Sequence, residues 1–557
     1  MRAGVAALAS MLAAAAAGAG SPRPQPPAEP TAQSFPVTIR VDLERRLGAL
    51  APIWRFFGGD EPNYATMKDG RRLLSALGEL EPREVYFRTH NLLNTGDGTP
   101  ALKWGSTNAY TEDAQGRPRY DWTVVDRIFD TYLERGVRPY VQIGFMPQAL
   151  STKPEPYQHE WRPGLPYGDV YTGWAYPPKD YTKWADLVYA WVRHSVDRYG
   201  EEEVLTWYWE TWNEANIGYW QGTPEEFFKL HDHAVAAVRR ALPRARVGGP
   251  DMAGSDPKFL GAFLEHCRAN GTPLDFVAFH AKGAPVYTSG HVRMGIAAQL
   301  ETIDRGFATV AAAGLRGTPI VIGESDPEGC AACQGPQLAY RNGTMYSSYT
   351  AASFARKHDL AARHGVNLEG ALTWAFEFED QPYFAGFRAL ATNGIALPVL
   401  NVFRMFSKMR GERVAAASSA EVPLDTMLAE GVRGAPDVAA LASAAPGRVS
   451  VLTWHYHDDD VPGPDAGVAL SVAGLPATLA EATVTQHRID ADHSNAYAAW
   501  KRMGSPIAPS REQYGALLAA AELALLDGPS RQRVEDRTLT LRLVLPRQAV
   551  SLVTIEW

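Results

Sequence analysis

Two glutamates follow short apolar segments that lie far apart in this chain. Residues 205–217, which read LTWYWETWNEANI, form an aromatic, β-prone segment that ends in Asn213 and Glu214. Residues 319–324, PIVIGE, form a second apolar segment that ends in Glu324. Parallel barrels place active-site side chains at the C-terminal ends of their strands, so two such strands can bring two carboxyl groups together. Paired carboxyl groups set for proton transfer and nucleophilic attack are the machinery of glycoside hydrolysis.

Short strand patterns alternate with helical patterns from about Trp54 to Phe406. The predicted strands are Trp54–Gly58, Glu84–His90, Arg138–Gly144, the segment before Glu214, Ala245–Gly249, Asp275–His280, Pro319–Glu324 and Gly370–Phe376, and the predicted helices include Lys68–Leu80, Trp122–Arg135, Tyr181–Tyr199 and one from Pro224 to about Leu242. This α/β alternation predicts a (β/α)8 TIM barrel. A doubly wound open sheet is the alternative, but no Gly-rich phosphate loop follows the first strand.

The chain changes character after Met409, where a second, mostly-β domain is expected. Strand patterns occur at Arg448–Trp454, Gly467–Val472, Thr483–Ile489, Thr538–Leu545 and Val550–Trp557, with a helical interruption at Pro506–Leu526. Several short strands of this kind favour a β-sandwich. We therefore expect a catalytic barrel over residues 51–410 and a sandwich-like accessory domain over 411–557. An N-terminal strand within residues 36–50 is expected to join the accessory domain.

Composition and charge restrict the partners. The 557 residues carry a net charge of −8 with a pI near 6.0, which argues against nucleic acid or an anionic membrane and favours a neutral ligand. The Ala-rich start resembles a signal peptide over residues 1–19, followed by a Pro-rich leader over 20–35. That order predicts a secreted or periplasmic protein, with a disordered N-terminal tail as the alternative.

Three cysteines, Cys267, Cys330 and Cys333, exclude a disulfide-scaffold fold. Cys330 and Cys333 could form a small-loop disulfide in an exported protein. A thioredoxin-like redox role lacks the expected βαβ context, and a structural zinc site lacks a second ligand pair. We expect neither a metal nor a cofactor, since carboxyl groups and water suffice for glycoside hydrolysis.

The motif Trp212-Asn213-Glu214-Ala215-Asn216 resembles the acid/base motif of glycoside hydrolase family 39, a retaining clan A family that includes β-xylosidases and α-L-iduronidases. The resemblance continues through Asp60–Tyr64, Phe87–Leu93, Phe276–His280, Ile322–Glu324, Leu372–Trp374, Arg488–Tyr497 and Trp500–Pro506, which together span nearly the whole chain. Ala215 stands where the family usually has Pro, and Ser325 where many relatives have Trp. We expect these differences to alter loop stiffness and contacts near the site rather than the chemistry.

The resemblance implies roles for individual residues. Glu214 would be the general acid/base and Glu324 the nucleophile, with Arg88 hydrogen-bonded to the nucleophile. The positions of His90 and His280 match substrate-site histidines of the family, where a neutral imidazole can bind sugar hydroxyls or the nucleophile.

Three further substrate contacts are expected. Asn213 can bind the sugar 2-hydroxyl, an interaction that strengthens in the transition state. Trp374 resembles the platform under the sugar. Glu377 and Glu379 would share one face of an extended segment, where one of them could hold the outer hydroxyls.

The sequence thus predicts a retaining exo-glycosidase that acts on an oligosaccharide or glycoside. A β-D-xylosidase that releases xylose from xylo-oligosaccharides is favoured. α-L-Arabinosides, β-glucosides, β-galactosides and α-L-iduronides stay open as substrates. A non-catalytic carbohydrate-binding barrel, redox function through the Cys330–Cys333 pair and assembly into a homo-oligomer are also left open.

Overall fold

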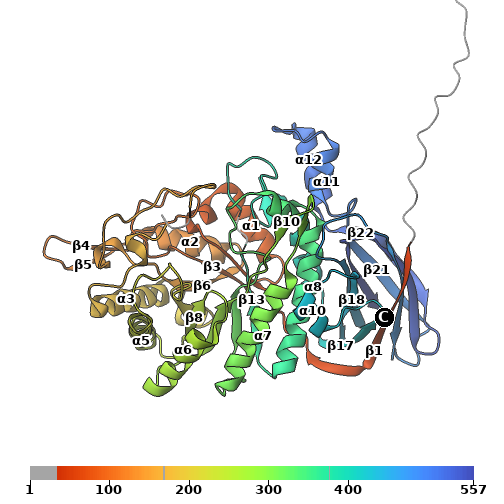
Figure 1. Ribbon diagram of the computed structural model, residues 1–557, viewed down its shortest axis with the longest axis horizontal. Helices are drawn as coiled ribbons and strands as arrows, with labels where there is room; N and C mark the ends of the chain where they lie inside the picture. The colour runs from red at the N-terminus through yellow and green to blue at the C-terminus, as the bar shows by residue number, and fades with distance from the viewer. Residues whose placement is uncertain (1–33, 167–169, 375–376) are drawn as a thin grey trace, which may run out of the picture.

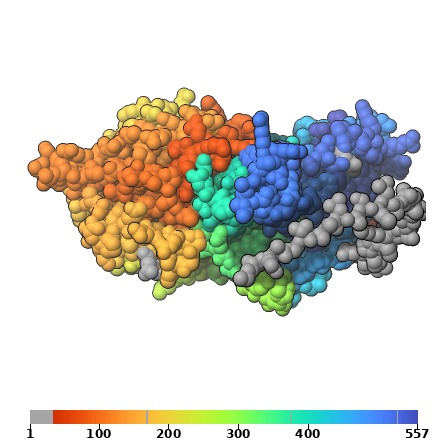
Figure 2. Space-filling model, turned by 90° about the horizontal axis from the view of Figure 1, so that it is seen from above, coloured from red at the N-terminus to blue at the C-terminus, as the bar shows by residue number. Residues whose placement is uncertain are grey.

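The computed structural model describes residues 34–166, 170–374 and 377–557. The predicted signal peptide and most of the Pro-rich leader lie outside these residues, as do the last two residues of the predicted strand Gly370–Phe376. Figure 1 shows the chain folded into two parts, a barrel and a separate β-sheet, and Figure 2 shows them at opposite ends of an elongated molecule.

The first part is an almost closed parallel sheet that confirms the predicted TIM barrel. Its described strands, in spatial order, are β13 (Leu368–Ala371), β12 (Ile320–Glu324), β9 (Phe276–His280), β8 (Arg246–Met252), β7 (Tyr208–Thr211), β6 (Val137–Ile143), β3 (Val85–Thr89), β2 (Phe56–Gly59) and β14 (Thr373–Trp374). β13 pairs with β12 and β14 pairs with β2. The predicted eighth strand is therefore split in two, and its halves close the barrel.

Helices follow the strands in the alternation expected of this fold. They are α1 (Lys68–Gly78), α2 (Thr123–Glu134), α3 (Tyr181–Tyr199), α5 (Pro224–Ala241), α6 (Pro257–Asn270), α7 (Ile296–Ala312), α8 (Thr344–His364) and α9 (Pro398–Phe406). Local sequence explains their ends. α5 begins with a capping box between Thr223 and Glu226 and has Pro224 in its first turn, where its missing N–H costs nothing. α3 begins at the N-cap Asp180 and ends at Gly200, which has a positive φ of 87°.

The second part confirms the predicted mostly-β region. The described strands form one sheet in the order β22 (Ala524–Arg533), β21 (Glu481–Ile489), β24 (Val550–Glu556), β19 (Arg448–Tyr456), β18 (Asp437–Ala445), β17 (Glu412–Ser418), β1 (Phe35–Ala49), β20 (Ala466–Ala473) and β23 (Thr538–Leu545). β1 runs antiparallel to β17 and parallel to β20. Strands from both halves of the sheet share a core that includes Val41, Val451 and Leu470, so the sheet folds over itself.

The two parts pack through a continuous apolar interface. Leu452, Trp454 and Leu552 of the second sheet belong to the same core as the barrel residues. α8 lies between the barrel and β19 (Figure 1). Two short helices, α11 (Ala496–Arg502) and α12 (Arg511–Ala521), project from the second sheet, and α12 reaches back to the barrel where the Tyr514 hydroxyl donates to the carbonyl of Asn393. None of the described helices is long and apolar enough to span a membrane.

Candidate active site

The structure brings Glu214 and Glu324 together at the C-terminal end of the barrel. Glu324 is the last residue of β12, and Glu214 lies three residues beyond the end of β7. Glu214 adopts a positive φ of 50°, and its backbone N–H donates to the carbonyl of Asp251 at 2.8 Å. A carboxylate oxygen of each glutamate lies within 4.8 Å of the other. Both side chains are largely buried, with exposed fractions of 16% for Glu214 and 8% for Glu324.

Positive charge surrounds the Glu324 carboxylate. Nζ of Lys282 lies 2.5 Å from Oε2, and Nη1 of Arg88 and Nδ1 of His280 each lie 3.7 Å from Oε1. Burial alone would raise the pKa of Glu324, but the charges on His280 and Lys282 outweigh it and hold the pKa well below its usual value. Glu324 is therefore ionised at neutral pH, as a carboxylate nucleophile must be.

His280 connects Glu214 to a buried acid that sequence patterns did not single out. Its Nδ1 lies 2.8 Å from Oε1 of Glu214, and its Nε2 lies 2.9 Å from Oδ2 of Asp251. Burial alone would lower the pKa of His280, but the carboxylates of Asp251 and Glu324 raise it to about 10. The expectation of a neutral imidazole is therefore wrong at this position, because both ring nitrogens face carboxylates and the ring is an imidazolium.

Arg88 lies fully buried below the two glutamates. Its Nε donates to Glu210 at 2.5 Å, and its Nη2 donates to both Asp251 and Asn213. Its Nη1 lies close enough to Glu324 for an ion pair, not for a hydrogen bond. Arg88 thus binds the acids that surround Glu324 more tightly than it binds Glu324 itself.

His90 and Trp374 form the opposite side of the site. The two rings lie 4.5 Å apart between centroids, and Nε2 of His90 lies 3.6 Å from Oε1 of Glu324. Nδ1 of His90 lies 3.1 Å from Asp60, which is also paired with Lys103. Burial lowers the pKa of His90 and outweighs the hydrogen bond to Asp60, which raises it, and the charge of Arg88 adds to the lowering. These effects favour the neutral ring.

Asn213 presents an unused donor. Its Oδ1 accepts a hydrogen bond from Arg88 at 3.1 Å, which fixes the orientation of the amide. Its Nδ2 is buried and has no hydrogen-bond partner among the described residues. Leaving a buried donor unpaired costs about 1–3 kcal/mol, so a ligand hydroxyl that accepts this hydrogen bond would be favoured.

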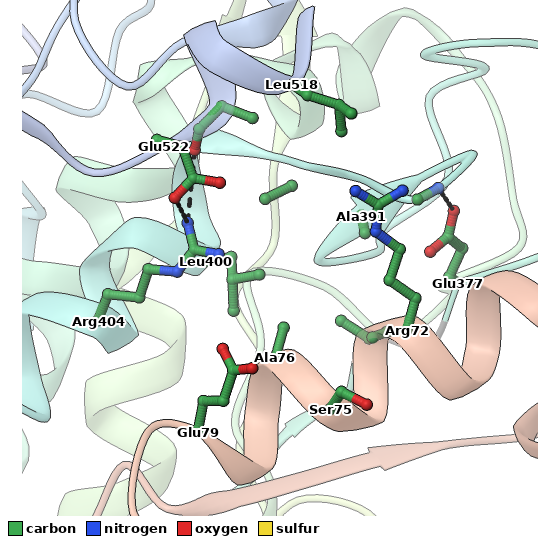
Figure 3. Close-up of a pocket in the computed structure, with 14 residues that line it drawn as sticks. Arg72, Ser75, Ala76, Glu79, Glu377, Ala391, Leu400, Arg404, Leu518 and Glu522 are labelled. Atoms are coloured by element: carbon green, nitrogen blue, oxygen red, sulfur yellow. Dashed lines mark hydrogen bonds and ion pairs between the residues drawn. The ribbon is translucent and has the colours of Figure 1, made fainter. Parts of the chain in front are cut away.

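Glu377 and Glu379 bind other parts of the barrel. Oε1 of Glu377 accepts a hydrogen bond from the N–H of Gly394 at 2.7 Å, and Glu377 lines a pocket with Arg72 of α1 (Figure 3). Oε2 of Glu379 accepts from the N–H of Asp69, in the first turn of α1, at 3.1 Å. Among the described residues, neither carboxyl is hydrogen-bonded to another predicted site residue. The structure thus places both against α1 rather than on the Glu214–Glu324 pair.

Distance alone would allow a metal ion between Glu214, His280 and Glu324, the one such group among the described residues. The charges argue against it. His280 is an imidazolium, and Lys282 is already bound to Glu324. A metal ligand must be an unprotonated nitrogen or a free carboxylate, so these groups do not fit a metal.

A cavity of about 500 Å³ opens from Glu214 and Lys282 toward the surface. Glu214 lines it and Glu324 does not, so a molecule bound there would touch the Glu214 side of the site. Cys330 and Cys333, joined in a disulfide, form part of its wall. Sequence patterns left open whether these two cysteines are bonded.

Comparisons with known proteins agree with this geometry. The sequence model of the glycosyl hydrolases family 39 matches residues 37–528. A β-xylosidase of Geobacillus stearothermophilus is 27% identical over 496 residues, covering 85% of this chain and 86% of the relative. An α-L-iduronidase of Mus musculus is 25% identical over 567 residues, covering 93% of this chain and 81% of the relative. The crystal structure of a monomeric β-xylosidase from Caulobacter crescentus CB15 has the same fold, with a TM-score of 0.73 at 23% identity over 93% of this chain and 99% of that one.

Proposed function

The chain belongs to the glycosyl hydrolases family 39, and from that premise we propose that it is a retaining, exo-acting glycosidase. The observation that carries the proposal is the approach of Glu214 and Glu324 to within 4.8 Å between carboxylate oxygens. Retaining enzymes hold their two carboxyl groups about 5–5.5 Å apart, whereas inverting enzymes separate them by about 6.5–9.5 Å to admit a water molecule. The spacing in this barrel supports attack by a carboxylate rather than by water.

In the proposed reaction Glu324 attacks the anomeric carbon while Glu214 donates a proton to the departing oxygen. The bond from the anomeric carbon to the aglycone breaks, and an ester bond to Glu324 forms. Glu214, now a carboxylate, then removes a proton from water, which attacks the same carbon and releases the sugar. The depressed pKa of Glu324 supports its role as nucleophile, and the greater exposure of Glu214 supports proton exchange with solvent.

The unpaired Nδ2 of Asn213 supports a contact with the sugar 2-hydroxyl. Arg88 fixes the amide so that Nδ2, not Oδ1, is left for the ligand. Trp374, whose ring is tilted by 39° against that of His90, supports a platform beneath the sugar ring. Both features would favour a neutral pyranose bound close to the two carboxyl groups.

We propose β-D-xylose as the sugar. Two relatives of this chain are β-xylosidases, although four other relatives are α-L-iduronidases. The cations placed in the site favour a neutral sugar, because each is paired with a carboxylate: Arg88 with Asp251, Lys103 with Asp60 and Lys282 with Glu324. An iduronide would bring a further carboxylate, and each of these cations is already paired with a carboxylate of the protein.

A panel of 4-nitrophenyl glycosides tests the proposal. We expect the β-D-xyloside to give the highest kcat/KM, and proton NMR of the first-formed sugar to show the β-anomer. An α-anomer as first product would contradict the retaining mechanism. Failure to hydrolyse any glycoside of the panel, with sugar binding preserved, would favour the non-catalytic carbohydrate-binding barrel.

We also propose that the protein works in an oxidising compartment. The disulfide between Cys330 and Cys333 supports this proposal, since such bonds persist mainly outside the cytoplasm. Cell fractionation with an antibody against the chain tests it. Recovery of the protein in the cytoplasmic fraction alone would contradict it.

A further inference from the structure

The cavity beside Glu214 lies where the proposed mechanism places the leaving group, since Glu214 donates its proton to the departing oxygen. We call this space the outer cavity. Its apolar lining comes from loops that follow four barrel strands and consists of Tyr171, Ile217, Tyr219, Ala284, Pro285, the Cys330–Cys333 disulfide and Leu338. A volume of about 500 Å³ falls within the range of small-molecule sites and is large enough for a ring-containing aglycone.

The backbone of the disulfide wall is already hydrogen-bonded inside the protein. Nη2 of the buried Arg341 donates to the carbonyl of Cys330 at 2.6 Å, and Nη1 donates to the carbonyls of Cys333 at 2.5 Å and Ala331 at 3.2 Å. The N–H of Cys330 donates to Glu328 at 2.7 Å. These polar groups face the protein interior, so the wall offers a ligand carbon and sulfur rather than hydrogen bonds.

The charged side chains that line the outer cavity are also engaged. Nζ of Lys282 binds Glu324 and lies 3.1 Å from Asp326. Glu328 binds Arg388 at 2.7 Å and accepts a hydrogen bond from Tyr340 at 3.0 Å. Gln337 is a further polar side chain in the lining and can bind one hydroxyl. A second sugar unit would bring several hydroxyls into this space, and each hydroxyl that lost water without gaining a partner would weaken binding.

The rim of the outer cavity adds an apolar side chain beside two aromatic rings. Ile217 lines the cavity and is 41% exposed. Tyr171 and Tyr219 lie next to it, with their rings edge to face at 5.4 Å between centroids. An aromatic or alkyl group seated between these side chains would bury apolar surface that water now covers.

We propose that the outer cavity binds an apolar aglycone, so that aryl-containing or alkyl glycosides, rather than oligosaccharides, are the preferred substrates. This inference rests on the proposed function and refines it. The sugar that is released stays the same, while the group on the other side of the scissile bond changes from a second xylose to an apolar alcohol. Ile217 and the disulfide are then residues that determine specificity.

The test compares three β-glycosides of the sugar selected by the nitrophenyl panel: the 2-phenylethyl glycoside, the methyl glycoside and the disaccharide. All three leaving groups are alcohols, so leaving-group acidity contributes less than it does with nitrophenol. We expect kcat/KM for the 2-phenylethyl glycoside to exceed both other values by roughly tenfold, from burial of the phenyl ring. Equal or faster hydrolysis of the disaccharide would overturn the inference and leave the glycosidase function intact.

Two variants locate the effect. Ile217→Asn and the double variant Cys330→Ser/Cys333→Ser should each lower the ratio of kcat/KM for the 2-phenylethyl glycoside to that for the methyl glycoside by roughly threefold to fivefold. Ile507→Asn is the matched control, since Ile507 is 90% exposed on the α11–α12 connection and should leave the ratio unchanged. A ratio that stays unchanged in both cavity variants would overturn the inference. Loss of activity toward every glycoside in the parent protein would instead refute the proposed function.

Discussion

Nδ1 of His280 lies 2.8 Å from Oε1 of Glu214, and the same nitrogen lies 3.7 Å from Oε1 of Glu324. One imidazolium therefore faces both carboxyl groups of the proposed reaction. His280 also lies 2.9 Å from Oδ2 of Asp251, so the position of this ring relative to both glutamates is fixed from the side opposite to them.

The pKa of His280 should depend on the negative charge of Asp251. In the variant Asp251→Asn the carboxylate that faces Nε2 is replaced by a neutral amide of the same shape. Because that carboxylate and Glu324 together raise the pKa of His280 to about 10, we expect the pKa to fall by roughly one unit or more when Asp251 is neutralised. NMR of protein labelled with ¹⁵N-histidine measures the shift. Asp232→Asn is the control, since Asp232 pairs with His266 on the outside of the barrel, and an unchanged pKa in Asp251→Asn would contradict the assignment.

The loss of activity on removing the Glu214 carboxyl, the proposed proton donor, should depend on the leaving group. In Glu214→Ala we expect kcat/KM for a methyl glycoside to fall by about 10²–10⁴, the usual contribution of general acid–base catalysis. A 2,4-dinitrophenyl glycoside, whose leaving group needs no proton, should lose much less in kcat/KM. Glu202→Ala, at an exposed position of the short helix α4 (Glu201–Val204), serves as control. Equal losses for both substrates would show that Glu214 is not the acid.

The barrel was predictable because its signals are local. Aromatic and β-branched segments marked the strands, and helix caps such as Gly200 marked the boundaries. β17 and β18 were not predicted, since residues 415–446 are rich in alanine and their strands are fixed by pairing with β1 and β19 rather than by propensity.

The candidate site was predictable where a residue directly follows an apolar strand, as Glu324 does. Asp251 and Lys282 were missed although each lies at or just beyond the end of a barrel strand, and that position was the signal that could have found them. The charge of His280 could not be predicted, because it depends on Asp251, which is distant in sequence. The hydrogen bonds that Glu377 and Glu379 accept from the N–H groups of Gly394 and Asp69 could not be predicted, because they join segments that are not adjacent in sequence.

The buried carboxyl of Glu377 should make stability depend on pH. Burial raises its pKa to about 8, while the unfolded chain ionises it near its usual value of 4.5. Between these two values the unfolded state binds fewer protons than the folded state, so this group makes the protein less stable as pH rises from about 4.5 to 8. Glu377→Gln removes the ionisation. We expect its denaturation midpoint, relative to that of the parent, to be higher at pH 8.5 than at pH 5.

Urea unfolding followed by fluorescence at both pH values measures this difference. Glu202→Gln, at the exposed position in α4, should show the same midpoint as the parent at both pH values. A difference between Glu377→Gln and the parent that is the same at pH 5 and pH 8.5 would contradict the assigned pKa.

The packing of Gly323 against Asp251 predicts a loss of activity from one added methyl group. A Cβ atom at position 323 would lie 1.9 Å from Oδ1 of Asp251, a distance that forces the carboxylate to move. Asp251 holds both Arg88 and His280, so its displacement would disturb the charges that keep Glu324 ionised. We expect Gly323→Ala to lower kcat/KM by at least about tenfold, as misplaced catalytic groups do.

Gly261→Ala is the matched control, because position 261 in α6 has no atom within 4 Å of the new Cβ and alanine favours the helix. Full activity in Gly323→Ala, measured at equal circular dichroism, would show that the position of Asp251 does not control the site.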